Sequence, residues 1–354
     1  MNKKISYMFS LLMATALFTS CKNGDISFSD YEKGTTVYFA YQRPVRTIVL
    51  GDDEYDTTMD KAHKFKILAT FGGSYNGSNG SVQVSYDPSL VNNLVFSDGE
   101  PVKVMPERYY HIQTTNFLFN GTMNGGTEVE LTEDFFNDEH STKETYVIPL
   151  VMMEQSGFDR ILTGTLKEGG QPVRTDDSQW DVLPMDYVLY CVKFQNKYSG
   201  YWLTNGTSSI DNIEKGKVVE VDCESLYTSV YHASYTTNEY WQYKRDAAGN
   251  KTSDTETVSK TYEFTLLLTY DANDNCVITC LTPEYTGGGT GTWIDNGAVK
   301  SWGNKDRDLM DLSYKLDFHT TDELGNAIKA DVHEKLVWQR SGVTLHEFGA
   351  NYIK

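Results

Sequence analysis

Short runs of β-forming residues, separated by pairs of Asn and Gly, recur along the chain and constrain its fold more than any other feature. The runs occur at 36–41, 82–86, 102–105 and 146–151, and again at 187–194, 217–221, 262–270 and 276–280. Asn76-Gly77 and Asn120-Gly121 are turn signals, because Asn and Gly accept the positive φ that tight turns need. No long helical period accompanies the first set of runs, so the pattern predicts an all-β protein.

A polar stretch over residues 166–184 predicts a boundary between two domains. It contains Gly169-Gly170 and an acidic run at 176–177. On its N-terminal side, residues 35–165, many short strands favour an immunoglobulin-like β-sandwich. On its C-terminal side, residues 185–354, longer runs in strand–turn–strand order favour an antiparallel β-barrel or a second sandwich. A chain of 354 residues is long enough for both domains.

The N-terminal segment predicts export followed by attachment to a membrane through lipid. Residues 1–20 place two lysines before an apolar run that is too short to span a bilayer, which is typical of a signal peptide. The sequence 17–21, ending in Cys21, resembles a bacterial lipobox, although Phe18 stands where Leu is usual. This implies acylation of Cys21, with 21–34 as a polar tether. An ordinary signal peptide with an incidental cysteine is the alternative.

The lipid anchor sets the expected location. We expect the protein to be held at the outer membrane by its acyl chains alone, facing the cell exterior. Its 49 acidic and 31 basic residues give a formal net charge of −18, and no basic stripe is visible. A nucleic-acid partner is therefore disfavoured, and neutral ligands suit the surface better than anionic ones.

Motifs for metal chemistry are incomplete. His333-Glu334 and His346-Glu347 each lack the second histidine that a zinc-binding helix requires, so these histidines are expected on the surface. Residues 271–275 have Cys276 where a calcium loop needs Gly, which favours a hairpin turn over a weak calcium site. We therefore expect no metal and no cofactor.

Motifs for other chemistry are also weak. The glycine run at 287–291 lacks the lysine of a phosphate-binding loop, and we interpret it as a mobile loop. The acidic group around Asp306, Asp308 and Asp311 is better explained as a solvated face than as a catalytic pair. No catalytic residue is assigned, and absence of enzymatic activity is the favoured interpretation. Four cysteines, at 191, 223, 276 and 280, leave disulfides or free thiols open.

Aromatic residues provide the candidate ligand-binding positions. All six tryptophans lie in or just before the predicted second domain. Sugar rings pack their C–H faces on Trp and Tyr, and their hydroxyls pair with amides and carboxylates. The residues with such neighbours are Tyr201, Trp202, Trp241, Tyr243, Trp293 and Trp302, whereas Trp338 is assigned to the core. For each one alone, a place in the core is the commoner outcome, so we expect only some of them to contact ligand.

Several blocks of the first domain resemble a known family. Residues 46–52, 63–67, 106–110, 129–138 and 146–150 resemble, in this order, the N-terminal β-sandwich domain of surface lipoproteins from polysaccharide-utilisation loci of Bacteroidetes. Residues 192–202 resemble the opening strand of a C-terminal lipocalin-like barrel that is often paired with it.

The resemblance implies a cell-surface glycan-binding lipoprotein. Such a protein would help to capture polysaccharide or glycoprotein glycans beside an uptake system of the SusC and SusD type. Two alternatives from other classes stay open. A glycoside hydrolase would need a carboxylate pair in a cleft of the second domain. An adhesin or fimbrial subunit would need a sheet edge that accepts a donor strand.

Overall fold

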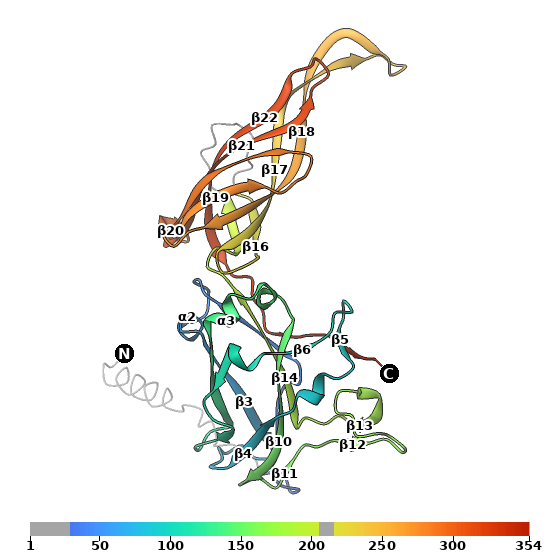
Figure 1. The fold of residues 1–354 in the computed structure, drawn as a ribbon, viewed down its shortest axis with the longest axis vertical. Coiled ribbons are helices and arrows are strands. Elements are labelled where there is room, and N and C mark those ends of the chain that lie inside the picture. Colours follow the sequence, from blue (N-terminus) through green and yellow to red (C-terminus); the bar gives the residue numbers. More distant parts are fainter. Residues whose placement is uncertain (1–28, 205–215, 354) are drawn as a thin grey trace, which may run out of the picture.

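The structure is a computed structural model that describes residues 29–204 and 216–353. Strands make up most of these residues and form two lobes, one above the other along the longest axis (Figure 1). The all-β prediction is confirmed. The predicted signal peptide and Cys21 lie outside the described residues. No helix in the described ranges is long and apolar enough to cross a membrane.

The first lobe is a curled sheet around a phenylalanine-rich core. A single 12-stranded sheet has the order β11-β1-β3-β9-β8-β4-β10-β14-β2-β23, with β6 paired to β10 and β7 to β9. Its strands are β1 (Thr36–Tyr38), β2 (Pro44–Val49), β3 (Lys64–Gly72), β4 (Ser81–Tyr86), β6 (Lys103–Val104), β7 (Tyr110–Ile112), β8 (Asn116–Leu118), β9 (Asn124–Leu131), β10 (Tyr146–Ser156), β11 (Arg160–Ile161), β14 (Tyr187–Gln195) and β23 (His346–Glu347). Alternate residues of β3, from Phe65 to Phe71, are buried, as a sheet with one covered face requires. This agrees with the predicted sandwich-like lobe.

Small elements border this sheet. Two short pairs, β12 (Thr165–Leu166) with β13 (Trp180–Val182) and β5 (Leu94–Phe96) with β24 (Ala350–Tyr352), lie beside it. The helical turns are α2 (Thr58–Lys61), α3 (Glu133–Phe136), η2 (Pro88–Val91), η3 (Glu107–Tyr109), η4 (Glu139–Thr142) and η5 (Asp177–Gln179). Phe135 and Phe136 of α3 are buried against Phe194, so this turn closes one end of the core.

The second lobe is a closed barrel in which each strand pairs antiparallel with the next in sequence. Eight strands of the described chain form it: β15 (Gly200–Thr204), β16 (Val218–Cys223), β17 (Thr228–Arg245), β18 (Lys251–Tyr270), β19 (Asn275–Cys280), β20 (Thr286–Trp302), β21 (Lys305–Thr321) and β22 (Ala327–Arg340). β15 also pairs with β22, which closes the wall. The predicted antiparallel barrel is confirmed. The strands β17 and β18 continue past its upper end as a long arm (Figure 1).

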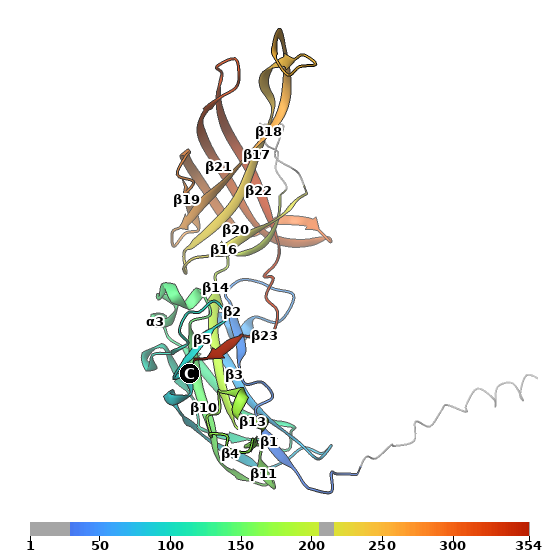
Figure 2. The same cartoon turned by 90° about the vertical axis from the view of Figure 1, so that its right-hand side faces the viewer.

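The boundary between the lobes differs from the predicted one. β14 belongs to the first sheet, where it pairs with β10 and β2, although the sequence placed the linker at 166–184 and the second domain from 185. Val188 faces one buried cluster and Leu189 the other, so β14 is a central strand covered on both faces. The chain crosses to the barrel after Gln195 and returns after Arg340, ending in the first lobe with β23 and β24 (Figure 2).

The glycine run at 287–291 is a strand and not the expected mobile loop. It forms the first part of β20, between β19 and β21. A Cβ on Gly289 would lie 2.0 Å from the carbonyl oxygen of Ser313, and one on Gly288 would lie 2.4 Å from that of Ile278. The missing side chains therefore let neighbouring strands approach closely, which the sequence pattern alone does not reveal.

Polar contacts tie the barrel to the segment that enters it. The Asn196 amide donates to the carbonyl oxygens of Ser225 at 2.6 Å and Thr228 at 3.0 Å. The Tyr198 hydroxyl donates to Asp274 at 2.7 Å, and Lys197 forms an ion pair with the same carboxylate. These buried and half-buried contacts hold residues 196–198, which lead into β15, against the β16–β17 and β18–β19 turns.

Candidate ligand-binding site

The ladders that β15 and β16 form with their neighbours in the barrel wall are short. The β16–β17 ladder runs from Cys223↔Ser229 only to Val221↔Tyr231, and β15 pairs with β22 only as far as Thr204↔Leu336. Beyond these points the described residues of β17 and β22 continue without β15 or β16 beside them. β16 and β17 therefore separate beyond Val221↔Tyr231, and the described residues of the two strands border a gap in this ladder.

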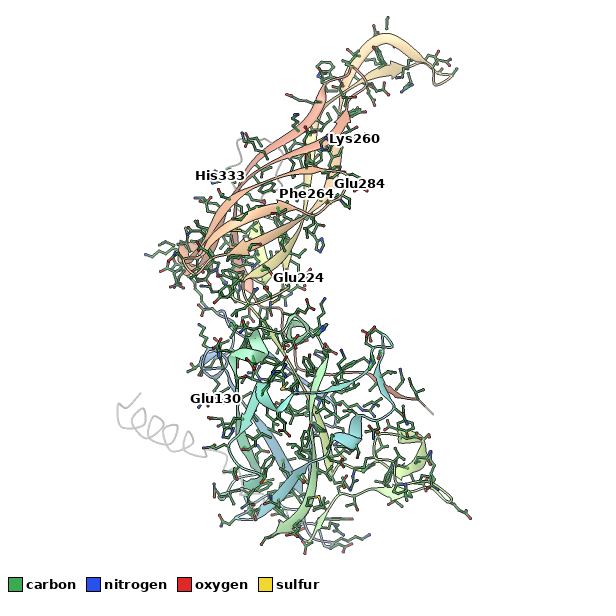
Figure 3. The ribbon with its side chains drawn as sticks, viewed as in Figure 1. Glu130, Glu224, Lys260, Phe264, Glu284 and His333 are labelled. Carbon is green, nitrogen blue, oxygen red and sulfur yellow. The ribbon has the colours of Figure 1, made fainter. Side chains whose placement is uncertain are left out.

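A pocket of about 640 Å³ lies at this gap. It is lined by Tyr231, Phe264 and Glu334, which face the barrel interior, and by His232 and Glu263, which face outward. Residues of both faces of the wall therefore contribute to the pocket, and the three that face inward are almost completely buried. Phe264 lies at mid-height of the barrel (Figure 3). The volume is within the range of small-molecule sites.

Glu334 is the buried acid of this pocket. It is 2% exposed, its Oε1 accepts a hydrogen bond from the Tyr314 hydroxyl at 2.8 Å, and its Oε2 accepts one from the Tyr231 hydroxyl at 3.4 Å. Loss of hydration on burial raises the pKa of Glu334 to about 7, and the two phenol hydrogen bonds offset only part of that effect. Among the described residues, none forms an ion pair with it.

The outer rim of the pocket is acidic. Glu220, Asp222 and Glu263 line it, together with the cationic or titratable Lys217 and His232. The Asp222 carboxylate lies 3.5 Å from the His232 ring, and desolvation together with the Glu220 charge raises the pKa of Asp222. Excess carboxylates repel anionic ligands and attract cationic ones.

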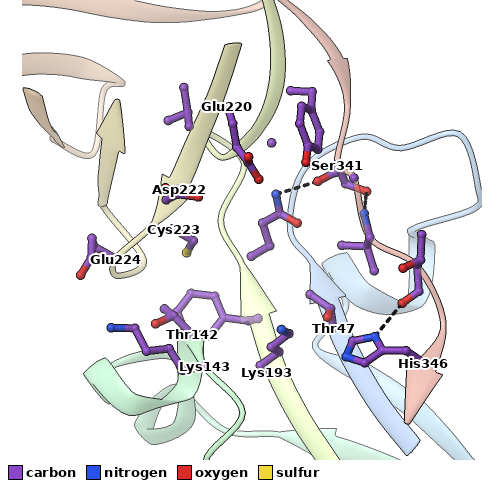
Figure 4. A pocket seen from close by; sticks show the side chains of 18 residues that line it. Thr47, Thr142, Lys143, Lys193, Glu220, Asp222, Cys223, Glu224, Ser341 and His346 are labelled. Carbon is purple, nitrogen blue, oxygen red and sulfur yellow. Dashed lines mark hydrogen bonds between the residues drawn. The ribbon is translucent and has the colours of Figure 1, made fainter. Parts of the chain in front are cut away.

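A second pocket, of about 440 Å³, lies between the lobes. Figure 4 shows Glu220, Asp222 and Glu224 on its barrel side and Lys143 and Lys193 on its first-lobe side. Glu220 and Asp222 line both pockets, so a continuous acidic surface on β16 connects them. The mixed charges of this second pocket differ from the combination of aromatic and acidic groups in the barrel wall.

Two of the predicted ligand residues lie where β15 enters the barrel. Tyr201 lines the pocket between the lobes, with the Arg340 guanidinium 4.6 Å from its ring centre. The charge and hydrogen bond of Glu220 raise the pKa of Tyr201. Trp202 is 0% exposed and lies in the barrel core, so the structure does not place its ring on the surface, and ligand contact by Trp202 stays a prediction. Alternation along β15 turns its ring inward, opposite to Tyr201.

The remaining predicted residues lie on other parts of the barrel. Trp241 is 39% exposed on the arm of β17, and Tyr243, two residues further on, is half-buried with Lys251 over its ring. Trp293 on β20 is half-buried beneath Lys197. The side chain of Trp302 lies outside the described part of the structure. The six residues therefore do not form one site, and Trp338 is buried in the core, as predicted.

Glu334 and Tyr231 are not among the residues predicted from the sequence. A signal for Glu334 was present, because Ile328, Val332, Leu336 and Trp338 alternate along β22 and Glu334 falls in the same inward register. The pair His333-Glu334 is incomplete as a zinc motif, but a carboxylate at an inward position among apolar residues of a strand is a signal for a buried acid.

No metal site emerges from the described residues. None of their His, Cys, Asp and Glu side chains gather in groups of three or more suited to an ion. The Asp271 carboxylate instead accepts hydrogen bonds from the backbone of Asn273 and Asn275, which confirms the turn between β18 and β19. Cys191, Cys223, Cys276 and Cys280 are free thiols.

Family models match each lobe separately. A model described only as an N-terminal domain matches residues 31–159, and one described as Domain of unknown function (DUF5627) matches residues 197–342. The second range coincides with the barrel and its two connections to the first lobe. No curated protein matches this sequence.

Solved structures from Bacteroides are similar to this chain. A Bacteroides ovatus protein of unknown function is 29% identical, with a TM-score of 0.73 over 92% of this chain and 100% of that one. An auxiliary nutrient binding protein from Bacteroides thetaiotaomicron is 13% identical over 83% of this chain and 90% of that one, with a TM-score of 0.32. A candidate carbohydrate-binding protein from Bacteroides ovatus is 14% identical over 88% and 97%, with a TM-score of 0.26. The first of these supports the two-lobed fold.

Proposed function

We propose that this protein binds carbohydrate in the pocket of the barrel wall. The observation that carries the proposal is the composition of this pocket, which is lined by Phe264, Tyr231 and Glu334. An aromatic ring packs on the C–H face of a sugar, and the phenol and carboxylate oxygens accept or donate hydrogen bonds to its hydroxyls.

The location follows from the leader sequence. In this proposal Cys21 is acylated and holds the protein at the outer membrane, so that the two lobes face the cell exterior. There the protein captures polysaccharide or glycoprotein glycans and passes them to an uptake system of the SusC and SusD type. The resemblance of the first lobe to surface lipoproteins of polysaccharide-utilisation loci supports this role.

Glycan binding is tested with the soluble chain of residues 22–354 on an array of host and plant glycans. Tyr231→Phe removes one hydroxyl from the pocket and is expected to weaken binding of a hit about fivefold. Phe264→Leu removes the ring at similar volume and is expected to weaken it further. Tyr86→Phe, on β4 of the first lobe, is the matched control and is expected to bind like the wild type.

Two results contradict the proposal. Retention of no glycan under any condition would remove the binding function. Loss of binding with Trp241→Ala, but not with Tyr231→Phe or Phe264→Leu, would move the site to the exposed aromatic residues of the β17 arm.

A glycoside hydrolase is the second candidate function. Hydrolysis of a glycosidic bond uses a protonated carboxyl as acid and a second carboxylate, about 5 to 10 Å away. Glu334 has the raised pKa of such an acid, and Glu220, Asp222 and Glu263 line the same pocket. Release of reducing sugar from a bound glycan, abolished by Glu334→Gln, would establish this activity. Binding without release would exclude it for that glycan.

A further inference from the structure

A buried carboxylate without a cation is the least compensated charge of the barrel-wall pocket. Glu334 receives only the two phenol hydrogen bonds from Tyr231 and Tyr314, and among the described residues no Lys, Arg or His is paired with it. An ionised carboxylate has about four acceptor positions, so two tyrosine donors leave others unused. Burial of such a group is unfavourable until a donor or a cation reaches it.

The charges around Glu334 add to this imbalance. Glu220 and Asp222 from β16 and Glu263 from β18 line the pocket, against Lys217 before β16 and His232 on β17. His232 already faces Asp222 at 3.5 Å. A ligand that carries negative charge meets repulsion here, whereas a ligand that carries an ammonium group gains attraction from the rim and a direct partner in Glu334.

We infer that the pocket selects sugars that carry a protonated amino group, with the ammonium bound by Glu334. The inference rests on the proposed carbohydrate-binding function and adds the class of sugar. Phe264 and Tyr231 then hold the sugar ring, and Glu334 is the residue that determines specificity. Neutral sugars bind through the same ring contacts with lower affinity, and uronates are excluded.

Four oligosaccharides of equal length test this inference: a glucosamine, an N-acetylglucosamine, a glucose and a glucuronate oligomer. Each is titrated calorimetrically into the soluble chain of residues 22–354. Acetylation removes the positive charge while the ring stays, so the glucosamine oligomer is expected to bind about tenfold more tightly than its acetylated form. The glucuronate oligomer is expected to give no measurable binding.

Two variants assign the preference to Glu334. Glu334→Gln keeps the shape of the side chain and is expected to abolish the tenfold preference, while affinity for the glucose oligomer stays within about threefold. Glu130→Gln, on the exposed face of the first lobe (Figure 3), is the matched control and is expected to keep the preference. An alkyl amine without a sugar is titrated as well and is expected to bind far more weakly than the glucosamine oligomer.

The outcomes separate the inference from the proposed function. Equal affinity for the glucosamine and glucose oligomers, or a preference that survives Glu334→Gln, overturns the inference and leaves carbohydrate binding intact. An alkyl amine that binds as tightly as the amino sugar overturns the assignment to sugars. Absence of binding by all four oligomers, together with a silent glycan array, overturns both.

Discussion

Replacement of Glu334 by Gln should make the stability of the barrel less dependent on pH. Burial raises the pKa of Glu334 from its ordinary 4.5 to about 7 in the folded protein. Between these values the folded state binds the proton more tightly than the unfolded state, so the stability that this group contributes falls as pH rises through the window. Gln carries no proton to lose, and the variant does not show this fall.

The expected magnitude follows from the size of the pKa shift. One pKa unit corresponds to about 1.4 kcal/mol, so the free energy of unfolding of the wild type relative to Glu334→Gln should fall by about 3 kcal/mol between pH 4.5 and pH 8. The NH2 group of Gln cannot accept the hydrogen bond that one oxygen of Glu334 accepts from a tyrosine hydroxyl, and this lowers the stability of the variant by about 1 kcal/mol at all pH values. The variant should therefore be less stable at pH 4.5 and more stable at pH 8.

Urea unfolding followed by tryptophan fluorescence measures this difference. Five of the six tryptophans lie in barrel strands, so the signal reports mainly on that lobe. Glu130→Gln is the control and should follow the wild type at every pH. A difference between Glu334→Gln and the wild type that stays constant from pH 4.5 to pH 8 would refute the reasoning, because Glu334 would then titrate as an ordinary exposed carboxyl.

Three further predictions concern packing and the connection between the lobes. Gly289→Ala places a Cβ 2.0 Å from the Ser313 carbonyl oxygen and should lower the free energy of unfolding of the barrel by about 2 kcal/mol or more in urea. In Gly72→Ala the nearest atom to the new Cβ is 3.7 Å away, so this substitution should change the free energy of unfolding by less than about 1 kcal/mol. Asn196→Ala removes hydrogen bonds to Ser225 and Thr228 and should lower the stability by about 2 kcal/mol, seen as a lower Tm; an unchanged Tm would contradict the role of this contact. Trp202→Ala leaves a cavity in the barrel core and should lower the free energy of unfolding by about 3 to 5 kcal/mol, whereas Trp241→Ala, at an exposed position, should have little effect. Equal effects of the two substitutions would contradict their different burial.

The strand pattern was sufficient to predict the fold class. Runs such as 262–270 and 276–280 became β18 and β19, joined at the predicted turn, because alternation and turn residues are local properties. The C-terminal boundary of the first lobe was not predicted correctly, because it depends on which strands β14 pairs with. β14 is apolar on both faces because a buried cluster covers each of them, and its edges pair with β10 and β2; the preceding polar stretch gave no sign of either contact.

The candidate site was harder to predict than the fold. Trp202 and Tyr201 are adjacent, yet one is core and the other lines the pocket between the lobes, since the direction of each depends on the register of β15. Glu334 became notable only when the barrel brought it to Tyr314 on the neighbouring strand β21 and to Tyr231 on β17, which is 103 residues away in sequence. Chemical motifs of fixed spacing do not detect groups that meet across a barrel.

The central claim is that carbohydrate binds in the wall of the barrel. A crystal structure of the soluble chain with the strongest hit of the glycan array tests it most directly. We expect a sugar ring between β16 and β17, packed on Phe264 and within hydrogen-bond distance of Glu334 or Tyr231. A sugar bound instead at Trp241 on the β17 arm, or in the pocket between the lobes, would contradict it.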